Sequence, residues 1–352
     1  MASETIQVSS RANTSQRIIA AGIVVGFFYW ASNIVMTLLL SVLFAYFLEP
    51  LVEGLERLRV RRALGALVVV LVALSLVAGL AYLVFDRVEH FLGDWPRYSS
   101  VLKRAATDIE NRLERVEKRL SEITPGEPET RPGVRLEEPR PLRTWLVSGL
   151  GSLRVVLLTA TFVPFLIFFM LAGKREVWHA TLQLFPPSQR TRVKQALDEV
   201  SVVLRSYVAG NMLVAAILAL VSWFFFWLLN LDYPFLAGTV SGFLNLVPYL
   251  GAVLAWIPPF VVGLGKWHTI GPYVGVAAML GFFHLMALNV LIPAVVGRRV
   301  HLNALAVTVA LLFWGWLWGA VGLILAIPIT ATFKVFCDHT EGWQPVGRWL
   351  GP

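Results

Sequence analysis

The sequence predicts an all-α polytopic membrane protein with about six to eight membrane segments, two of them re-entrant hairpins of broken helix in the C-terminal half. Of its 352 residues, 57% are apolar and only 15% are charged, whereas soluble domains average about 25% charged residues. A membrane-spanning helix needs about 20 apolar residues. Six runs without a charged residue exceed that length: 18–48, 63–85, 206–231, 233–265, 267–297 and 300–333.

The N-terminal region, 1–85, contains transmembrane helices and an arginine cluster. As one helix, residues 18–48 would measure about 46 Å, against a hydrocarbon core of about 30 Å. The triplet 31–33 (Ala-Ser-Asn) favours a break into two helices over one long tilted helix. Four arginines lie within residues 57–62, and such clusters predict the cytoplasmic side. Residues 63–85 then cross outward.

Residues 86–144 form a separate, polar region with 12 acidic and 12 basic side chains, which we expect outside the cytoplasm. Its apolar residues are spaced alternately four and three apart, at Leu102, Ala106, Ile109, Leu113, Val116, Leu120 and Ile123. This pattern is typical of a coiled coil between copies, or of an amphipathic helix packed on its own chain or on the membrane. Five prolines within 124–141 predict an extended linker.

The chain then returns across the membrane at 145–172 and continues as a cytoplasmic amphipathic helix at 173–207. The transport core follows at 208–336, and 337–352 is a cytoplasmic tail, so we expect both termini in the cytoplasm. The net charge of +8 fits membrane orientation rather than nucleic-acid binding. One cysteine excludes an internal disulfide.

The charges between the last apolar runs favour two re-entrant hairpins, 235–265 and 303–333. If both runs return to the side they left, Arg298, Arg299 and Lys334 all lie inside and only Lys266 lies outside. Each run would also measure about 50 Å as a single helix, too long for one crossing. The alternative is a pair of long, tilted and kinked spans.

Both runs are broken near their middle. The first contains Asn245, Pro248 and Gly251, and the second contains Gly315, Gly319, Gly322 and Pro328. Irregular backbone at membrane depth survives only where it is buried in protein or lines a cavity. Paired broken segments therefore indicate a transport site.

Several motifs resemble the autoinducer-2 exporter family of bacterial membrane proteins. Residues 245–251 (Asn-Leu-Val-Pro-Tyr-Leu-Gly) resemble its signature, and 48–52 (Leu-Glu-Pro-Leu-Val), 292–303 and 313–328 resemble further family patterns. The family usually has proline where this chain has Ala252 and Ala304, so we expect less sharp kinks. The resemblance implies a transporter of the bacterial inner membrane, since members are associated with export of a furanosyl signal molecule or with sodium/proton exchange.

Each candidate pathway residue also has a simpler structural interpretation. The Asn245 amide could cap its own hairpin or bind a solute or a cation, and Tyr249 could be a gate or an interfacial aromatic. A lone histidine such as His284 is more often a hydrogen-bonded core residue than a proton carrier, and Gly315 and Gly319 have the spacing of close helix packing. The pathway candidates are Asn211, Asn245, Pro248, Tyr249, Gly251, His284, Asn289, Gly315, Gly319, Gly322 and Pro328.

No Asp, Glu, Lys or Arg falls within the central part of the last four apolar runs. Because proton-coupled carriers commonly use intramembrane carboxylates, we expect an exporter of a small neutral polar or amphipathic molecule that works by alternating access. A sodium- or proton-coupled antiporter and a non-transporting membrane scaffold are the alternatives. We expect a homo-oligomer in the lipid bilayer, no enzymatic activity and no resident cofactor, with Na⁺ or H⁺ as the only candidate coupling ions.

Overall fold

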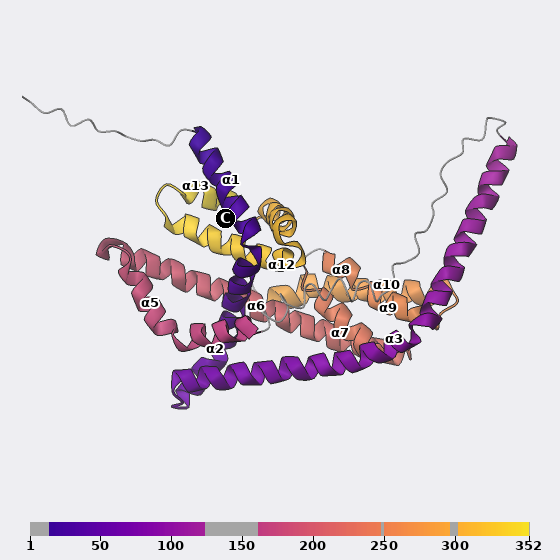
Figure 1. Ribbon diagram of the computed structural model, residues 1–352, viewed down its shortest axis with the longest axis horizontal. Helices are drawn as coiled ribbons and strands as arrows, with labels where there is room; N and C mark the ends of the chain where they lie inside the picture. Colours follow the sequence, from indigo (N-terminus) through magenta and orange to yellow (C-terminus); the bar gives the residue numbers. More distant parts are fainter. Residues whose placement is uncertain (1–13, 124–160, 248–249, 296–301, 352) are drawn as a thin grey trace, which may run out of the picture.

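The computed structural model describes residues 14–123, 161–247, 250–295 and 302–351 (Figure 1). Every regular element within these ranges is a helix. The helices are α1 Thr14–Trp30, α2 Ser32–Arg57, α3 Arg62–Ile123, an apolar helix Thr161–Ala172, α5 Lys174–Gln183, α6 Pro187–Leu228, α7 Pro234–Leu244, α8 Leu250–Leu254, α9 Ile257–Gly263, α10 Ile270–Met286, the π-helix η1 Ala287–Leu291, α11 Ile292–Val295, α12 Ala304–His339 and α13 Gln344–Leu350.

Five stretches are long and apolar enough to cross a membrane: Ser32–Arg57, Arg62–Ser100, Pro187–Leu228, Ile270–Val295 and Ala304–His339. Only between 11% and 39% of the residues in their apolar windows are buried inside the chain. Apolar helices with this much exposed surface need lipid or another chain around them. The structure therefore confirms an all-α polytopic membrane protein.

The first apolar run forms two helices that are interrupted at a single residue. Ala31 lies between α1 and α2 and has φ −87° and ψ 13°, and its carbonyl still accepts hydrogen bonds from the amides of Ile34 and Val35. The chain therefore goes on past Ala31 without reversing its direction (Figure 1). The interruption is a bend between consecutive helices and not a hairpin turn.

Two helices each continue across a boundary between regions that the sequence analysis treats as separate. α3 continues from its apolar first half through Pro96 into the polar region, and Figure 1 shows it turning sharply away from the bundle near its middle. The side chains at the seven heptad positions are not described, so self-association through them stays a prediction. The predicted linker at 124–141 and residues 145–160 lie outside the described residues. α6 likewise joins the amphipathic part of 173–207 to the span after it as one helix of 42 residues.

The first broken run folds back on itself against the second half of α6. A Cβ atom on Gly238 would meet the backbone of Trp223, and one on Gly242 would meet that of Ala219. α7 therefore runs antiparallel to α6, in backbone contact with it. Helices α8 and α9 then lead the chain back. The Lys266 ammonium donates to the carbonyls of Leu229 and Asn230, so this apolar run ends beside the point where it began.

The second broken run also reverses direction. Gly319 interrupts α12 with a non-helical φ of +60° and ψ of −139°. The two arms pack on each other, with Ala310 and Leu311 of the first arm against Ala326 of the second. At the open end, the Asn303 amide donates to the Leu350 carbonyl of α13, and α13 packs against the end of α12.

The two hairpins approach the middle of α6 from opposite ends. The first opens beside Asn230, after the end of α6. The second opens near the start of α6, where the His339 Nε2 atom lies 3.6 Å from the Glu199 carboxylate and Glu341 forms an ion pair with Arg192. Two simple tilted spans would place their ends at opposite ends of α6, so the arrangement within the described residues is that of two inverted re-entrant hairpins.

Candidate functional site

The tip of the first hairpin brings two predicted pathway residues together. α7 ends at Leu244, and the pairing of Gly242 with Ala219 brings Asn245 level with about Ala216 of α6. There the His284 imidazole of α10 lies with Nδ1 3.2 Å from the Asn245 Oδ1 atom. Because an amide oxygen can only accept a hydrogen bond, this contact requires the proton on Nδ1.

This hydrogen bond leaves each partner with one further polar atom. The Asn245 Nδ2 group can donate and the neutral His284 Nε2 atom can accept, and neither has a hydrogen-bond partner in the part of the chain that the structure describes. Both side chains are half-buried. The pair therefore offers one donor and one acceptor, with no net charge, next to the tip of a broken helix.

The tip is held by backbone contacts that need small residues. A Cβ on Gly251 would lie 2.4 Å from the Leu244 carbonyl oxygen and 2.7 Å from the Asn245 Cα atom, so only glycine lets α8 turn back this closely. The buried Ser241 hydroxyl donates to the Ala255 carbonyl at 2.7 Å and ties the two arms together. Pro248 and Tyr249, also predicted for the pathway, lie outside the described residues.

At the tip of the second hairpin, glycine is needed for a turn of the backbone, whereas the sequence had suggested close packing between helices. Gly319 is the turn itself: its positive φ is a conformation that favours glycine, and a Cβ there would meet nothing within 4 Å. Close packing is thus the wrong interpretation for Gly319. Gly322 lies so near the Trp314 carbonyl that a Cβ would clash with it, and Gly315 lies against the Leu323 side chain.

Aromatic side chains fix this second tip to the N-terminal helices. The rings of Trp314 and Trp318 lie 4.8 Å apart, and Trp318 packs edge-on against Phe28 of α1. The Trp318 indole N–H also donates to the Phe28 carbonyl at 3.1 Å. These tryptophans therefore serve hairpin packing and do not form an open stacking surface.

Three further predicted pathway residues form hydrogen bonds with other residues of their own helix. Asn211 hydrogen-bonds to the Tyr207 side chain on α6. The Asn289 amide donates to the Leu285 carbonyl at 2.7 Å, inside the π-helical turn that precedes Pro293. Pro328 is buried in α12, and its carbonyl accepts from the Thr332 hydroxyl.

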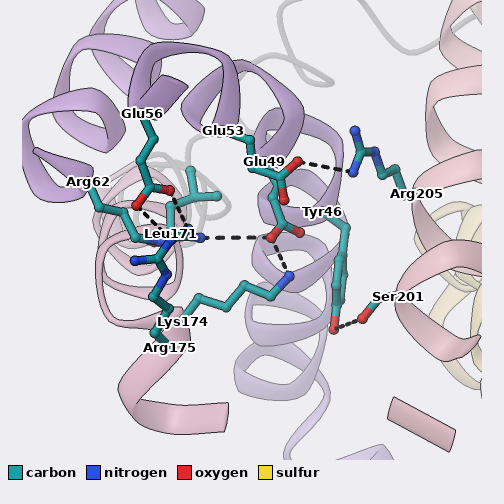
Figure 2. A network of polar contacts seen from close by, with 10 residues as sticks. All are labelled: Tyr46, Glu49, Glu53, Glu56, Arg62, Leu171, Lys174, Arg175, Ser201 and Arg205. Atoms are coloured by element: carbon teal, nitrogen blue, oxygen red, sulfur yellow. Dashed lines mark hydrogen bonds and ion pairs between the residues drawn. The ribbon is translucent and has the colours of Figure 1, made fainter. Parts of the chain in front are cut away.

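A charged network at one end of α2 was missed by the sequence reasoning (Figure 2). Its centre is Glu49, which is only 4% exposed. The Glu49 carboxylate binds the Lys174 ammonium directly and lies 3.8 Å from the Arg62 guanidinium. Arg62 in turn pairs with Glu56 at 3.2 Å and donates from Nε to the Leu171 carbonyl at 2.8 Å.

The network continues on both sides of this centre. Glu56 also binds Arg175 at 2.8 Å, and Glu53 lies 3.5 Å from Arg205 of α6. The sequence signal for it was present: Glu49, Glu53 and Glu56 are spaced four and three apart, which places them on one face of a helix. The ion pairs connect α2, α3, α5 and α6, so this network braces the end of the bundle that carries the arginine cluster.

Two neighbouring cavities lie beside this network and along α6. The larger, of about 850 Å³, is lined mostly by charged side chains and includes Val202 and Arg205. The same two residues line a second cavity of about 430 Å³, whose wall also includes Gly210 and Leu213 of α6 and Val295 of α11. Along α6 the lining of the two cavities ends at Leu213, about one helical turn before Ala216.

Close backbone packing is a second feature that sequence reasoning missed. Gly238 and Gly242 have the spacing of a GxxxG motif, which in membrane helices permits backbone contact. The motif lies in the arm of the hairpin that leads to Asn245. It fixes the position of the tip along α6.

Comparison with known proteins gives a consistent result. A family model described as "AI-2E family transporter" matches residues 18–342. The chain is 28% identical over 324 residues to "AI-2 transport protein TqsA" of Escherichia coli K12, covering 90% of this chain and 89% of that protein. It is 27% identical over 343 residues to "Putative transport protein YhhT" of the same strain, covering 95% and 91%. It is 33% identical over 199 residues to "Putative transport protein YrrI" of Bacillus subtilis 168, covering 55% and 54%.

Proposed function

Since the chain belongs to the AI-2E family of transporters, we propose that it exports a small neutral polar or amphipathic solute across the bacterial inner membrane. The solute class is that of autoinducer-2, because a relative that aligns over 90% of this chain is named an AI-2 transport protein. The proposal goes beyond family membership in naming the solute class, the site and the mode of movement.

The observation that carries the proposal is the Asn245–His284 pair at the first hairpin tip. Its hydrogen bond leaves one donor and one acceptor directed to other partners. A hydroxylated solute can satisfy both at once, whereas an ion would find no opposite charge, because the runs 233–265 and 267–297 contain no Asp, Glu, Lys or Arg. The buried carboxylate of Glu49 is already neutralised by Lys174 and Arg62.

Alternating access follows from the placement of the two hairpins. They enter from opposite ends of α6, and their tips approach its middle, so opening one side requires a shift of a hairpin relative to this helix. The cavity of about 430 Å³ along α6, which is lined by Gly210, Leu213 and Val295, supports a solute route on the side of α6 that leads towards the Asn245–His284 pair. The glycine face of α7 presents backbone instead of interlocking side chains to α6.

Flux into proteoliposomes tests the proposal. The full-length protein is reconstituted, and uptake of autoinducer-2 and of a panel of neutral polyols is measured with and without a sodium or pH gradient. Loss of one hydrogen bond is worth about 1 kcal/mol, so Asn245→Ala and His284→Ala should each lower flux about fivefold. The control is Asn289→Ala, since among the described residues that amide donates only to the Leu285 carbonyl of its own helix.

Each outcome is decisive for one part of the proposal. Unchanged flux in both site variants would refute the site. Flux that requires a sodium or proton gradient would favour the antiporter over a facilitated exporter. Failure of the wild-type protein to move any of these solutes would favour the membrane scaffold.

A further inference from the structure

We propose that the charged cavity beside Glu49 binds the headgroup of a zwitterionic phospholipid with a primary amine, and that the apolar groove next to it holds one acyl chain. This site lies apart from the Asn245–His284 pair and does not depend on the proposed transport function. Its ligand is a component of the bilayer and not the transported solute.

Two adjoining hollows of opposite character define the site. The charged cavity measures about 850 Å³ and the apolar groove about 250 Å³. They share Glu49, Lys174 and Trp178 in their walls. The groove is otherwise lined by apolar side chains of α2 and of the segment 170–177, including Val42 and Val177. A ligand that fills both hollows must have a charged part and an apolar part.

The charges of the cavity favour a zwitterionic headgroup over an anionic one. Its wall carries four carboxylates and five lysine or arginine side chains, so the two signs nearly balance. Most are already ion-paired with each other, as Figure 2 shows. Arg57 and Asp198, however, line the cavity without an ion-pair partner among the described residues. One free cation suits a phosphate, and one free carboxylate suits an ammonium group.

The junction between the two hollows favours a primary amine over a choline. Choline headgroups are bound by open aromatic faces. Here one face of each of Tyr46 and Trp178 is already occupied, because the Lys174 ammonium lies 5.5 Å and 5.3 Å from their ring centres. A primary ammonium can instead donate hydrogen bonds to carboxylates such as Asp198. Trp178 itself lies between a charged and an apolar region, the usual place of an interfacial tryptophan.

Lipid retention by the full-length protein tests this inference. The purified protein is equilibrated in detergent with equal amounts of phosphatidylethanolamine, phosphatidylcholine and phosphatidylglycerol, and the retained lipid is measured by native mass spectrometry. We expect phosphatidylethanolamine to be retained about fivefold more than either of the others. Arg57→Gln and Asp198→Asn should each lower its retention about two- to fivefold, the upper part of the range for one exposed ion pair.

Matched controls separate the site from general surface charge. Arg59→Gln removes an exposed charge two residues from Arg57 that does not line the cavity, and it should leave retention unchanged. In the groove, Val177→Gln should weaken retention, whereas Leu184→Gln, which lies on the exposed surface outside the groove, should not. All five variants change side chains at exposed positions, and size-exclusion profiles report whether each remains folded.

Four results would overturn the inference. Equal retention of phosphatidylglycerol would refute the zwitterionic headgroup, and equal retention of phosphatidylcholine would refute the primary amine. Competition by glycerophosphoethanolamine, which lacks acyl chains, at the same concentration as the lipid would refute the groove. Displacement of the lipid by autoinducer-2 would assign the cavity to the transport route instead.

Discussion

Adding one methyl group to Gly242 should displace the first hairpin from α6. A Cβ at this position would lie 2.4 Å from the Ala219 Cα and N atoms and 2.5 Å from its Cβ. Ordinary contacts between such atoms are about 3.5 to 4 Å, so Gly242→Ala requires α7 to move about 1 Å away from α6. Both sides of this contact are helical backbone, and no flexible side chain can absorb the shift.

The magnitude follows from two opposing effects. Overpacking in a close-packed interface costs about 1–3 kcal/mol, whereas replacing a helical glycine by alanine gains about 0.5–1 kcal/mol. The net effect of Gly242→Ala is therefore a destabilisation of about 0–2.5 kcal/mol, and of about 1 kcal/mol at the middle of both ranges. Gly275→Ala in α10 is the matched control, because a Cβ there meets nothing within 4 Å, and only the favourable effect remains.

Thermal unfolding in detergent, followed by tryptophan fluorescence, should shift in opposite directions for these two identical substitutions. Gly242→Ala should lower the midpoint and Gly275→Ala should raise it slightly. Flux should also fall in Gly242→Ala, because a shift of α7 by about 1 Å would disturb the 3.2 Å contact between Asn245 and His284. If both variants raise the midpoint, α7 does not contact α6 as the structure shows.

Two further predictions concern the second hairpin and the charged network. Gly319→Ala should lower the unfolding midpoint, since its backbone conformation costs a non-glycine residue about 1–3 kcal/mol, and an unchanged midpoint would contradict the turn at this residue. Glu49→Gln should destabilise the protein by about 3–5 kcal/mol because it leaves Lys174 and Arg62 without their buried partner. Glu53→Gln, in a more exposed pair, should cost less than about 1 kcal/mol, and equal effects of the two in thermal unfolding would show that Glu49 is not the centre of the network.

The hairpins could be predicted because their signals are local in the sequence. Each run is too long for one crossing, is broken in its middle and has cations placed to suit a return to the same side. The turn at Gly319 shows the limit of this reasoning. Spacing alone cannot distinguish a glycine that packs from one that turns, because the backbone φ decides between them and φ depends on the finished fold.

For the candidate site, the sequence predicted individual residues but not the contacts between them. Asn245 and His284 were each identified, but their contact joins residues 39 positions apart and depends on how α10 packs beside the hairpin tip. Glu49 was overlooked as the centre of the charged network even though it belongs to a stripe of acids that is visible in the sequence. Its partner Lys174 is 125 residues away, and no local pattern specifies which cation will reach a given carboxylate.

The charged groups and the neutral polar groups have different roles: the charged ones hold the fold, and the neutral ones are those that we propose contact the solute. Charges in the network are satisfied by each other across four helices, so they stabilise the bundle but offer little to a neutral ligand. The Asn245–His284 pair contributes one hydrogen bond to stability and keeps two polar atoms for other partners. Asn245→Ala should therefore lower flux with little change in the unfolding midpoint, whereas Glu49→Gln should lower the midpoint first. If Asn245→Ala instead destabilised the protein as much as Glu49→Gln, its amide would serve the hairpin and not the solute.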